Sequence, residues 1–303
     1  MNIWDVDRPE PPVVVITGAT SGIGELAAID LARRGAHLVL TARNAERAEQ
    51  TVTHIRRVSP NTVIDIIDAD FTDLASTRRA GMEINHRYAR VDVLINNAGL
   101  HAMSQRTTVD GLPEMITVNY LAPWLLTGTV LPALRRAACA RVVTVASEAS
   151  RRHGTLRIPD DLTSTAPFNA LQSSPLYGKS KLLDIMFTLE LADRLAGTAI
   201  SAMCLNPGYN TTGLGRELRF AAVLERILNV LGIGDPHNGA NLIVRVGTDS
   251  GLQSGGYYSG KSARLLTPVP PADDPRTRRE LWQATAELMA AKGYDGIYPG
   301  NAS

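Results

Sequence analysis

The chain has 303 residues, a hydrophobic fraction of 44% and a formal net charge of +1. A chain of this length and composition can bury a core without disulfide or metal staples, and its balanced charge without a long basic run argues against a nucleic-acid or anionic-membrane partner. The two cysteines, Cys139 and Cys204, have no metal-ligand spacing with the six histidines, so we expect buried free thiols and no metal site.

Residues 1–12 do not resemble a signal peptide or a membrane anchor, and the longest apolar region, 121–134, is too short to span a bilayer. These features predict a cytoplasmic protein.

Strand-like and helix-like segments alternate along the chain. The apolar run 13–17 predicts a buried strand, a glycine-rich turn follows, and residues 23–34 have helical periodicity that ends at Gly35. Further strands are predicted at 37–42, 62–68, 91–95, 141–146, 199–205 and 257–259, and further helices at 45–58, 73–88, 113–136, 177–196 and 275–292. The predicted fold is a single α/β domain with a doubly wound, Rossmann-type parallel sheet and helices on both faces. Residues 151–175, rich in Gly, Pro, Ser, Thr and Asp, predict a surface insertion within that domain.

The glycine-rich turn predicts a dinucleotide site. Its sequence is Thr17-Gly18-Ala19-Thr20-Ser21-Gly22-Ile23-Gly24, and it would direct backbone amides and a helix N-terminus at one point, which suits a pyrophosphate. Gly18 permits the turn, Gly22 lets the chain approach the phosphates, and Gly24 lets helix and strand pack closely. A plain turn is the alternative, but the position between strand and helix favours cofactor binding.

The end of the second strand indicates the type of cofactor. The strand ends Thr41-Ala42-Arg43, with Ala42 where an acidic residue would bind a ribose hydroxyl. Arg43 suits a 2′-phosphate instead, so we expect NADP(H) rather than NAD(H). An ordinary surface arginine is the alternative.

Tyr177 and Lys181 have the spacing Y-x-x-x-K and face the same way on a helix. A neighbouring cation favours the phenolate, so we expect Lys181 to bring the Tyr177 phenol, ordinarily near pH ~10, toward the range of proton exchange. On an exposed helix the same pair would simply be solvated. The Tyr-Lys spacing therefore indicates a catalytic site only together with the other motifs of the chain.

Taken together, the ordered motifs resemble the short-chain dehydrogenase/reductase family over nearly the whole chain. Besides the glycine turn and the Tyr-Lys pair, they are Asn96-Asn97-Ala98-Gly99, Asn119, Ser147 and Pro207-Gly208. Thr108-Val109-Asp110-Gly111 and the residues after Ser180-Lys181-Leu182 look like its retinol dehydrogenase branch. Taken alone, Ser147 would be a strand-end hydroxyl, Asn119 a polar helix residue and Asn96 a turn former.

The resemblance implies a catalytic tetrad. Ser147 would hydrogen-bond the substrate oxygen, Tyr177 would exchange its proton, and Lys181 would hold the nicotinamide ribose and tune Tyr177. Asn119 would support a water relay to Lys181. The implied cofactor contacts are Gly18, Thr20, Ser21, Gly22, Ile23, Gly24, Arg43, Asp70, Phe71, Asn97, Ala98, Gly99, Tyr177, Lys181, Pro207, Gly208 and Thr212.

In two places the chain departs from the family pattern. The segment between Ser147 and Tyr177 is longer than in many members, and Asn210 replaces a valine in the segment that ends at Thr212. By the same resemblance residues 213–235 would cover the substrate. Their near-helical apolar spacing predicts either a lid that selects a lipophilic substrate or a helix packed on its own core or a neighbouring subunit.

The resulting prediction is an NADP(H)-dependent oxidoreductase, a ketoreductase or alcohol dehydrogenase acting on a hydrophobic carbonyl or secondary alcohol. Hydride transfer builds alkoxide character on the substrate oxygen, which Ser147 and Tyr177 would stabilise. Two alternatives stay open: non-redox acid/base chemistry such as isomerisation or dehydration, and an NADP-responsive binding protein. The resemblance implies dimers or tetramers, although the late apolar helices could equally support a monomer.

Overall fold

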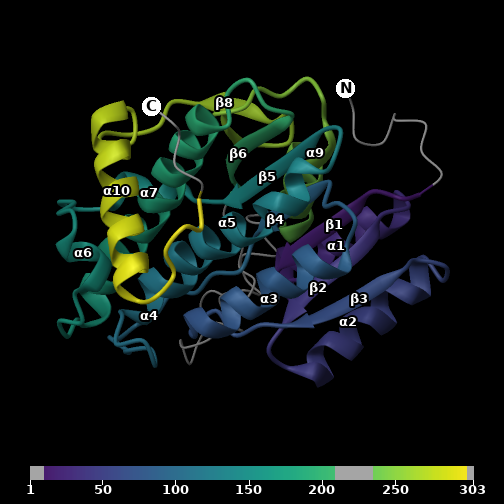
Figure 1. The fold of residues 1–303 in the computed structure, drawn as a ribbon, viewed down its shortest axis with the longest axis horizontal. Coiled ribbons are helices and arrows are strands. Elements are labelled where there is room, and N and C mark those ends of the chain that lie inside the picture. The colour runs from purple at the N-terminus through teal and green to yellow at the C-terminus, as the bar shows by residue number, and fades with distance from the viewer. Residues whose placement is uncertain (1–9, 209–234, 299–303) are drawn as a thin grey trace.

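An eight-stranded sheet runs through the molecule in the order β3-β2-β1-β4-β5-β6-β7-β8. The computed structural model describes residues 10–208 and 235–298 (Figure 1). Neighbouring strands are parallel up to β7, and β8 is antiparallel to it. The strands are β1 Val13–Thr17, β2 His37–Ala42, β3 Ile64–Asp68, β4 Val93–Asn96, β5 Ala140–Val145, β6 Ile200–Asn206, β7 Tyr257–Ser259 and β8 Arg264–Leu266.

The strand order reverses beside β1, where β2 lies on one side and β4 on the other, so the sheet is doubly wound as predicted. The helices are α1 Gly22–Arg33, α2 Ala45–Val58, α3 Leu74–Arg87, α4 Glu114–Ile116, η1 Thr117–Leu121, α5 Ala122–Arg135, η2 Glu148–Arg152, α6 Asp160–Thr163, α7 Ala170–Arg194, α9 Pro236–Thr248 and α10 Pro275–Ala291.

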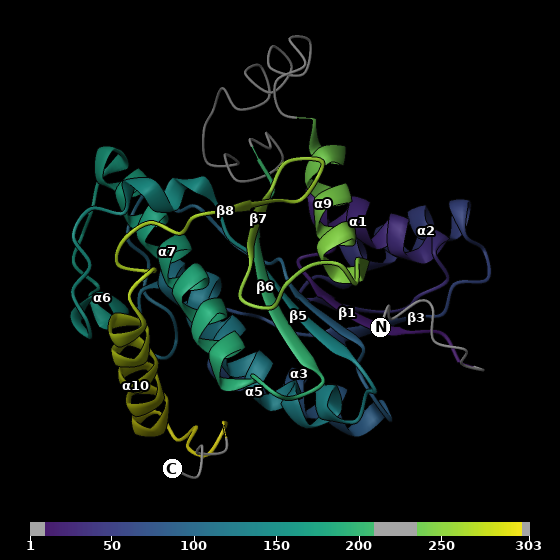
Figure 2. The ribbon, with the colours of Figure 1, turned by 90° about the horizontal axis from the view of Figure 1, so that it is seen from above.

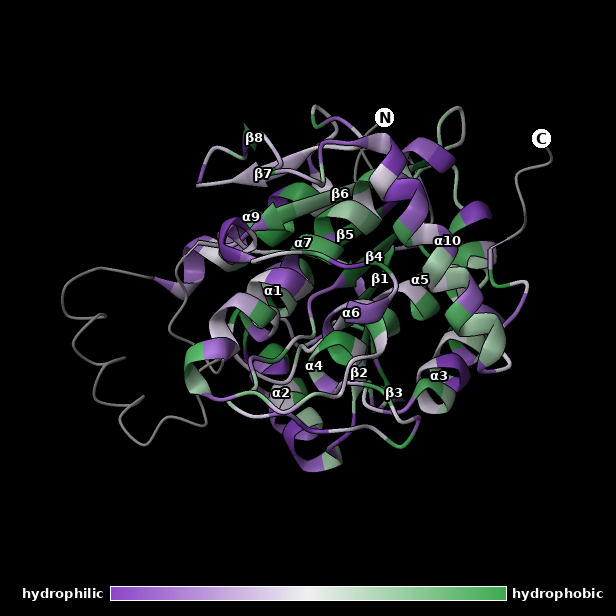
Figure 3. Ribbon diagram, turned by 90° about the vertical axis from the view of Figure 1, so that its left-hand side faces the viewer, coloured by the Kyte–Doolittle hydropathy of each residue, from purple (hydrophilic) through white to green (hydrophobic). Residues whose placement is uncertain are grey.

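Helices cover both faces of the sheet. In Figure 2, α1, α2 and α9 lie on one side, while α3, α5 and α7 lie on the other. One apolar core joins the strands to α3, α5, α7 and α10, and a second joins them to α1 and α9. Figure 3 shows the hydrophobic residues concentrated in the middle of the molecule. The central strands are buried on both faces, which is why they read as continuous apolar runs instead of alternating ones.

Most predicted elements are confirmed, and β2, α2 and β7 have the predicted bounds. Asp73 caps α3 by accepting hydrogen bonds from the amides of Ala75 and Ser76.

The predicted helix 113–136 is divided into α4, the π-helical η1 and α5. The reason is local, because Pro123 has no N–H to donate to the Asn119 carbonyl four residues earlier. The Ala122 amide instead bonds to the carbonyl of Thr117, five residues back. The widened turn contains Asn119.

The prediction that a helix begins at Tyr177 is wrong, since α7 begins at Ala170. The Asn169 side chain accepts from the amides of Leu171 and Gln172, and Gln172 bonds back to the Asn169 amide. This capping box starts the helix ahead of Pro175, whose missing N–H costs only one bond near the helix start. The rest of the segment packs on the same helix: Leu162 of α6 is buried, and Lys179 pairs with Asp161 at 2.7 Å.

Four elements of the described chain were not predicted: the short helices η2 and α6, helix α9 and strand β8. Helix α9 carries ordinary start signals, since Pro236 occupies its first turn and Asp235 accepts from the His237 amide. Strand β8 is short and largely exposed, and forms by pairing with β7. Nearly all of the predicted lid, including its apolar residues Leu218, Phe220, Val223, Leu224, Ile227, Leu228, Val230 and Leu231, lies outside the described residues. Within residues 10–208 and 235–298, no helix combines the length and hydropathy needed to cross a bilayer.

Candidate active site

The glycine turn joins the end of β1 to the start of α1. Gly18 and Gly22 have positive φ angles of 65° and 61°, a conformation that side chains with a Cβ rarely adopt. A Cβ on Gly24 would collide with the Asn97 amide nitrogen and the Gly18 carbonyl oxygen. In the described chain no side chain caps the start of α1. The turn therefore leaves helical N–H groups available to an anion, which fits a dinucleotide phosphate.

Asn97 and Ala98 tie the end of β4 to this turn. The Asn97 side chain donates to the carbonyls of Thr17 and Gly18 at 2.8 and 3.1 Å. The Thr17 hydroxyl oxygen accepts from the amides of Asn97 and Ala98, both at 2.9 Å. The segment thus holds together the two strands at which the sheet order reverses.

Arg43 and Asp70 lie close to the carboxyl ends of β2 and β3. The Arg43 guanidinium is 3.8 Å from the Asp70 carboxylate, and its side chain is 68% exposed. Asp70 accepts from the Thr72 amide and hydroxyl, which orients the carboxylate. Phe71 is half-buried against the core. An exposed guanidinium held loosely by one carboxylate can still reach an added phosphate.

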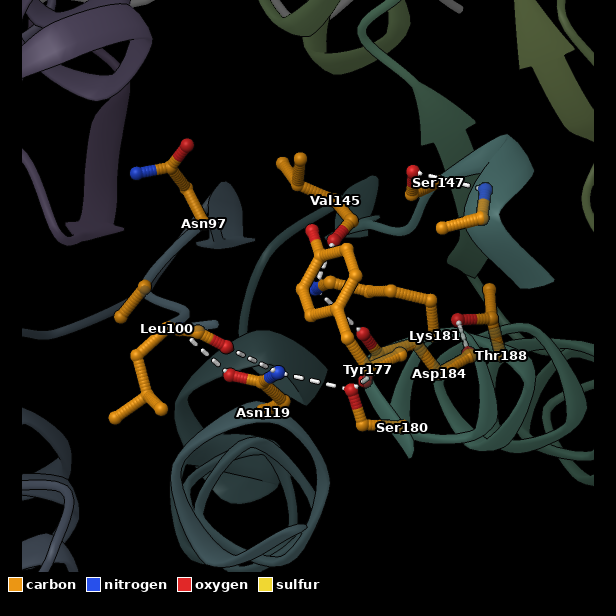
Figure 4. A network of polar contacts seen from close by, with 12 residues as sticks. Asn97, Leu100, Asn119, Val145, Ser147, Tyr177, Ser180, Lys181, Asp184 and Thr188 are labelled. Atoms are coloured by element: carbon orange, nitrogen blue, oxygen red, sulfur yellow. Dashed lines mark hydrogen bonds and ion pairs between the residues drawn. The ribbon is translucent and has the colours of Figure 1, made fainter. Parts of the chain in front are cut away.

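The four predicted tetrad residues come from three parts of the chain and meet beside the carboxyl end of β5 (Figure 4). Tyr177 and Lys181 lie on α7, Ser147 directly precedes η2, and Asn119 lies in η1. The Lys181 ammonium is 5.9 Å from the centre of the Tyr177 ring.

Ser147 is held by the packing of η2 against α7. Its hydroxyl oxygen accepts from the Ala149 amide at 3.1 Å. The Asn206 side chain at the end of β6 accepts from the Glu148 amide at 3.3 Å. A Cβ on Gly178 would collide with the Ala149 carbonyl, so the glycine that follows Tyr177 allows η2 to lie close to α7. Because its oxygen already accepts one bond, the Ser147 hydroxyl hydrogen can be directed at another oxygen.

Lys181 lies in a buried polar network. Its ammonium donates to the Val145 carbonyl of β5 at 2.9 Å and to the Asp184 carboxylate at 2.9 Å. Only 6% of the Lys181 side chain and 1% of the Asp184 side chain are exposed.

Asn119 joins a second chain of hydrogen bonds. Its amide nitrogen donates to the Ser180 hydroxyl and to the Leu100 carbonyl, both at 2.9 Å, and its oxygen accepts from the Leu100 amide at 2.8 Å. The Ser180 hydroxyl donates to the Tyr177 carbonyl at 2.8 Å. A Cβ on Gly99 would lie 3.3 Å from the Asn119 oxygen and 3.5 Å from the Lys181 nitrogen. The glycine therefore keeps the space between these side chains clear.

The pKa of the Tyr177 hydroxyl is raised above its ordinary value. Burial is the main cause, Lys181 lowers the pKa in part, Asp184 raises it, and a hydrogen bond with Ser147 lowers it. The prediction that Lys181 makes this phenol easier to ionise is thus wrong for the net pKa, because burial outweighs the cation and Asp184 offsets it. The Tyr177 phenol is therefore protonated at neutral pH.

Pro207 and Gly208 follow β6, as predicted. The Gly208 amide donates to the Asn206 side chain at 3.2 Å, and the Gly208 φ angle is 83°. Thr212, another implied cofactor contact, lies outside the described residues.

Two residues at the site were missed by sequence reasoning. Asp184 interrupts the apolar run after Lys181 at helical spacing i+3, a signal that could have identified it. His101 stacks on the Tyr177 ring, with centroids 4.5 Å apart, and its Nε2 atom is 2.8 Å from the Ser173 hydroxyl. No local pattern indicates that contact, because its partners are far away in sequence.

The sequence is similar to a family model and to curated proteins that are named dehydrogenases. Residues 12–159 match a family model described as short chain dehydrogenase. Human retinol dehydrogenase 13 is 32% identical over 283 residues, which are 91% of this chain and 84% of the relative. Human retinol dehydrogenase 14 is 33% identical over 295 residues, or 91% and 85% of the two chains.

Solved structures share the fold. An uncharacterised protein from Mycobacterium paratuberculosis superposes with a TM-score of 0.73 at 28% identity, over 96% of this chain and 97% of its own. A Beutenbergia cavernae structure with bound NADP, proposed to be an NAD(P)-dependent gluconate 5-dehydrogenase, has a TM-score of 0.63 at 25% identity, over 82% and 92%.

Proposed function

Because the chain belongs to the short-chain dehydrogenase/reductase family, in its retinol dehydrogenase-like branch, we propose that it is an NADP(H)-dependent oxidoreductase of a hydrophobic carbonyl or alcohol. The observation that carries the proposal is the convergence of Ser147, Tyr177 and Lys181 at the carboxyl end of β5 (Figure 4). Asn97, in the same view, bonds to the glycine turn. The bound nicotinamide would supply or accept the hydride.

In reduction, the substrate oxygen gains negative charge as hydride reaches its carbon. Tyr177 gives that oxygen a proton, which its raised pKa keeps on the phenol at neutral pH. Ser147 donates a hydrogen bond to the same oxygen, since its own oxygen is held by the Ala149 amide. Both donors are fixed before reaction by α7 and η2, so they favour the transition state more than the bound substrate.

The proton lost by Tyr177 must be replaced, and we assign this to a relay through Lys181 and Asn119. The space beside Gly99 lies between the Lys181 ammonium and the Asn119 side chain. The Asn119 carbonyl also cannot take an α-helical bond from Pro123. These two features support a water position that connects Lys181 to η1.

The choice of NADP(H) rests on Arg43, which is exposed at the end of β2 with no acid at Ala42. The Asp70 carboxylate at 3.8 Å keeps the guanidinium near Asp70 and Phe71, which are two of the implied cofactor contacts. By the same resemblance, Thr20, Ser21 and Ile23 would contact the phosphates within the glycine turn, and Pro207, Gly208 and Thr212 would contact the nicotinamide end of the cofactor.

The hydrophobic substrate class is inferred from relatives named retinol dehydrogenases and from the apolar pattern of residues 213–235. We assign one catalytic domain, with 213–235 as a substrate lid and with the insertion ending at residue 169, since residues 170–175 belong to α7.

The proposal is tested by NADPH oxidation with all-trans-retinal, decanal and a cyclic ketone, with Tyr177→Phe as the matched variant. We expect turnover of at least one substrate in the parent and a loss of at least about 100-fold in the variant, since a proton donor in the transition state contributes that much. Deuteride from labelled NADPH must appear in the product. Turnover without deuteride transfer would favour an isomerase or dehydratase, and cofactor binding without any turnover would favour a binding protein.

A further inference from the structure

Asp184 places a carboxylate beside the lysine of the proposed tetrad. Its Oδ2 atom accepts from the Lys181 ammonium at 2.9 Å, and both side chains are almost fully buried. The Oδ1 atom has no hydrogen-bond partner in the described part of the chain. A buried ion pair with an unsatisfied oxygen is a poor way to stabilise a fold, because the cost of removing the charges from water is only partly recovered.

The pair fixes where the Lys181 ammonium lies. An ammonium has three N–H donors, and two of them are used by Val145 and Asp184 on different sides of the side chain. One donor is left for the cofactor, the phenol or a relay. Asp184 is therefore placed to restrict the Lys181 head group, which would otherwise have a flexible four-carbon chain.

The charge of Asp184 also reaches Tyr177. Among the described residues, the titratable groups that interact with Asp184 are Lys181 and Tyr177 on the same helix, Tyr120 in η1 and Cys204 in β6. At Tyr177, His101 also faces the phenol ring, on which it stacks. Burial raises the pKa of Asp184 to about 6, and Lys181 offsets part of that rise, so the carboxyl is ionised above that pH. The carboxylate then opposes, at the phenol, the effect of the Lys181 charge.

We propose that Asp184 is a positioning residue that holds the Lys181 ammonium against β5 and, by opposing its charge at Tyr177, sets the pH at which Tyr177 exchanges its proton. This inference deepens the proposed function and rests on it. The carboxylate keeps the Tyr177 phenol protonated, which favours proton donation in reduction over proton abstraction in oxidation.

The test uses Asp184→Asn, which keeps the side-chain size and one acceptor oxygen but removes the charge. Phenolate absorbance of the full-length chain is titrated, and each protein is compared with its own Tyr177→Phe derivative to isolate Tyr177. We expect the Tyr177 titration to begin roughly one pH unit lower in Asp184→Asn than in the parent. The pH dependence of kcat for oxidation of all-trans-retinol, or of the alcohol of the best panel substrate, with NADP⁺ should shift the same way.

Glu190→Gln is the matched control. Glu190 is a second buried carboxylate on α7 and pairs with Arg194 at 2.8 Å, so removing its charge tests for a general effect on the helix. Its titration and its pH profile should equal those of the parent.

An unchanged or upward-shifted Tyr177 titration in Asp184→Asn would overturn the proposal. The proposal would also be overturned if Asp184→Asn lost alcohol oxidation at every pH while its Tyr177 phenolate formed at no lower pH than in the parent. Asp184 would then act only by keeping Lys181 protonated. Should circular dichroism show that Asp184→Asn does not fold, Asp184→Ser replaces it. Absence of turnover in the parent would contradict the proposed function, whereas the phenolate titration decides this inference without turnover.

Discussion

Arg43 is the residue on which the proposed choice of NADP(H) depends. Its guanidinium is exposed and paired loosely to Asp70, so it can donate two hydrogen bonds to a phosphate without losing a strong partner. The same side chain could make only a weaker hydrogen bond to a free ribose hydroxyl, which carries no charge. We therefore expect Arg43 to contribute to the difference in binding free energy between NADP(H) and NAD(H).

We expect Arg43→Ala to weaken NADPH binding by about tenfold or more, since a charge-assisted hydrogen bond contributes about 1.5–3 kcal/mol. NADH binding should change little. The measurement is the Kd of each cofactor by nucleotide fluorescence. Arg47→Ala, an exposed arginine on α2, is the control. Equal weakening for NADPH and NADH would contradict a 2′-phosphate contact.

At the scale of an element, α7 carries two of the proposed tetrad residues, the carboxylate that pairs with one of them and a separate ion pair near its end. Tyr177, Lys181 and Asp184 lie on the side that faces the sheet, while Glu190 and Arg194 pair near the helix end. The helix can hold these groups rigidly because most of its residues from Tyr177 onward are buried. A rigid support is what a site needs when donors must be placed before the reaction.

The edge formed by β2, β3 and α3 has a different kind of polar cluster. Asp65 accepts from His37 at 2.8 Å, from the Tyr88 hydroxyl at 2.9 Å and from Arg87 at 3.3 Å. Partial burial raises the pKa of Asp65, but the hydrogen bonds from His37 and Tyr88 outweigh it, and the net pKa is lowered. Asp65 thus stabilises the fold in its ionised form.

We expect Asp65→Asn to lower the free energy of unfolding by about 0.5–1 kcal/mol at pH 7, the usual range for a solvent-exposed ion pair. A lowered folded-state pKa means that the stabilisation is fully present above pH 3.8 and is lost as the pH falls through the folded-state pKa. Urea unfolding of parent and variant at pH 7 and at pH 3 measures both values. A difference that persists undiminished at pH 3 would rule out this origin, and Asp30→Asn on α1 is the comparison.

At the scale of the whole molecule, α10 attaches the C-terminal part of the described chain to the core. Figures 1 and 2 show it beside α7, at the outer side of the fold. Trp282 stacks on Phe187 with ring centroids 6.0 Å apart and meets Trp124 and Tyr298 at 5.7 and 4.6 Å. The Arg194 guanidinium lies 4.4 Å from its ring centre.

We expect Trp282→Ala to lower the free energy of unfolding by about 3–5 kcal/mol, because it removes a buried aromatic side chain and leaves a cavity. Trp282→Phe should cost less, since it keeps an aromatic ring in the cluster. Thermal and urea unfolding measure the loss. The kcat of the folded protein should remain close to that of the parent, and a large fall in kcat below the melting transition would show that α10 acts on the site.

Much of the fold follows from local patterns. The apolar runs of β1 and β2, the caps at Asn44 and Asp73 and the glycine turn each act over a few residues, so their elements could be placed from the sequence. The start of α7 was misplaced because a capping box at Asn169 outweighed the helix-breaking tendency of Pro175. The exposed strand β8 has no apolar pattern to reveal it.

The sequence by itself determined most of the strands and helices along the chain, the glycine turn and the spacing of Tyr177 and Lys181, because each depends on neighbours within one or two turns of chain. Only the tertiary structure decided the net pKa of Tyr177 and its contact with His101. It also decided that Lys181 forms a buried ion pair with Asp184. Burial is the physical reason, since it depends on how η1, β5, β6 and α7 pack together, and desolvation acts on a charge however distant in sequence its surroundings are.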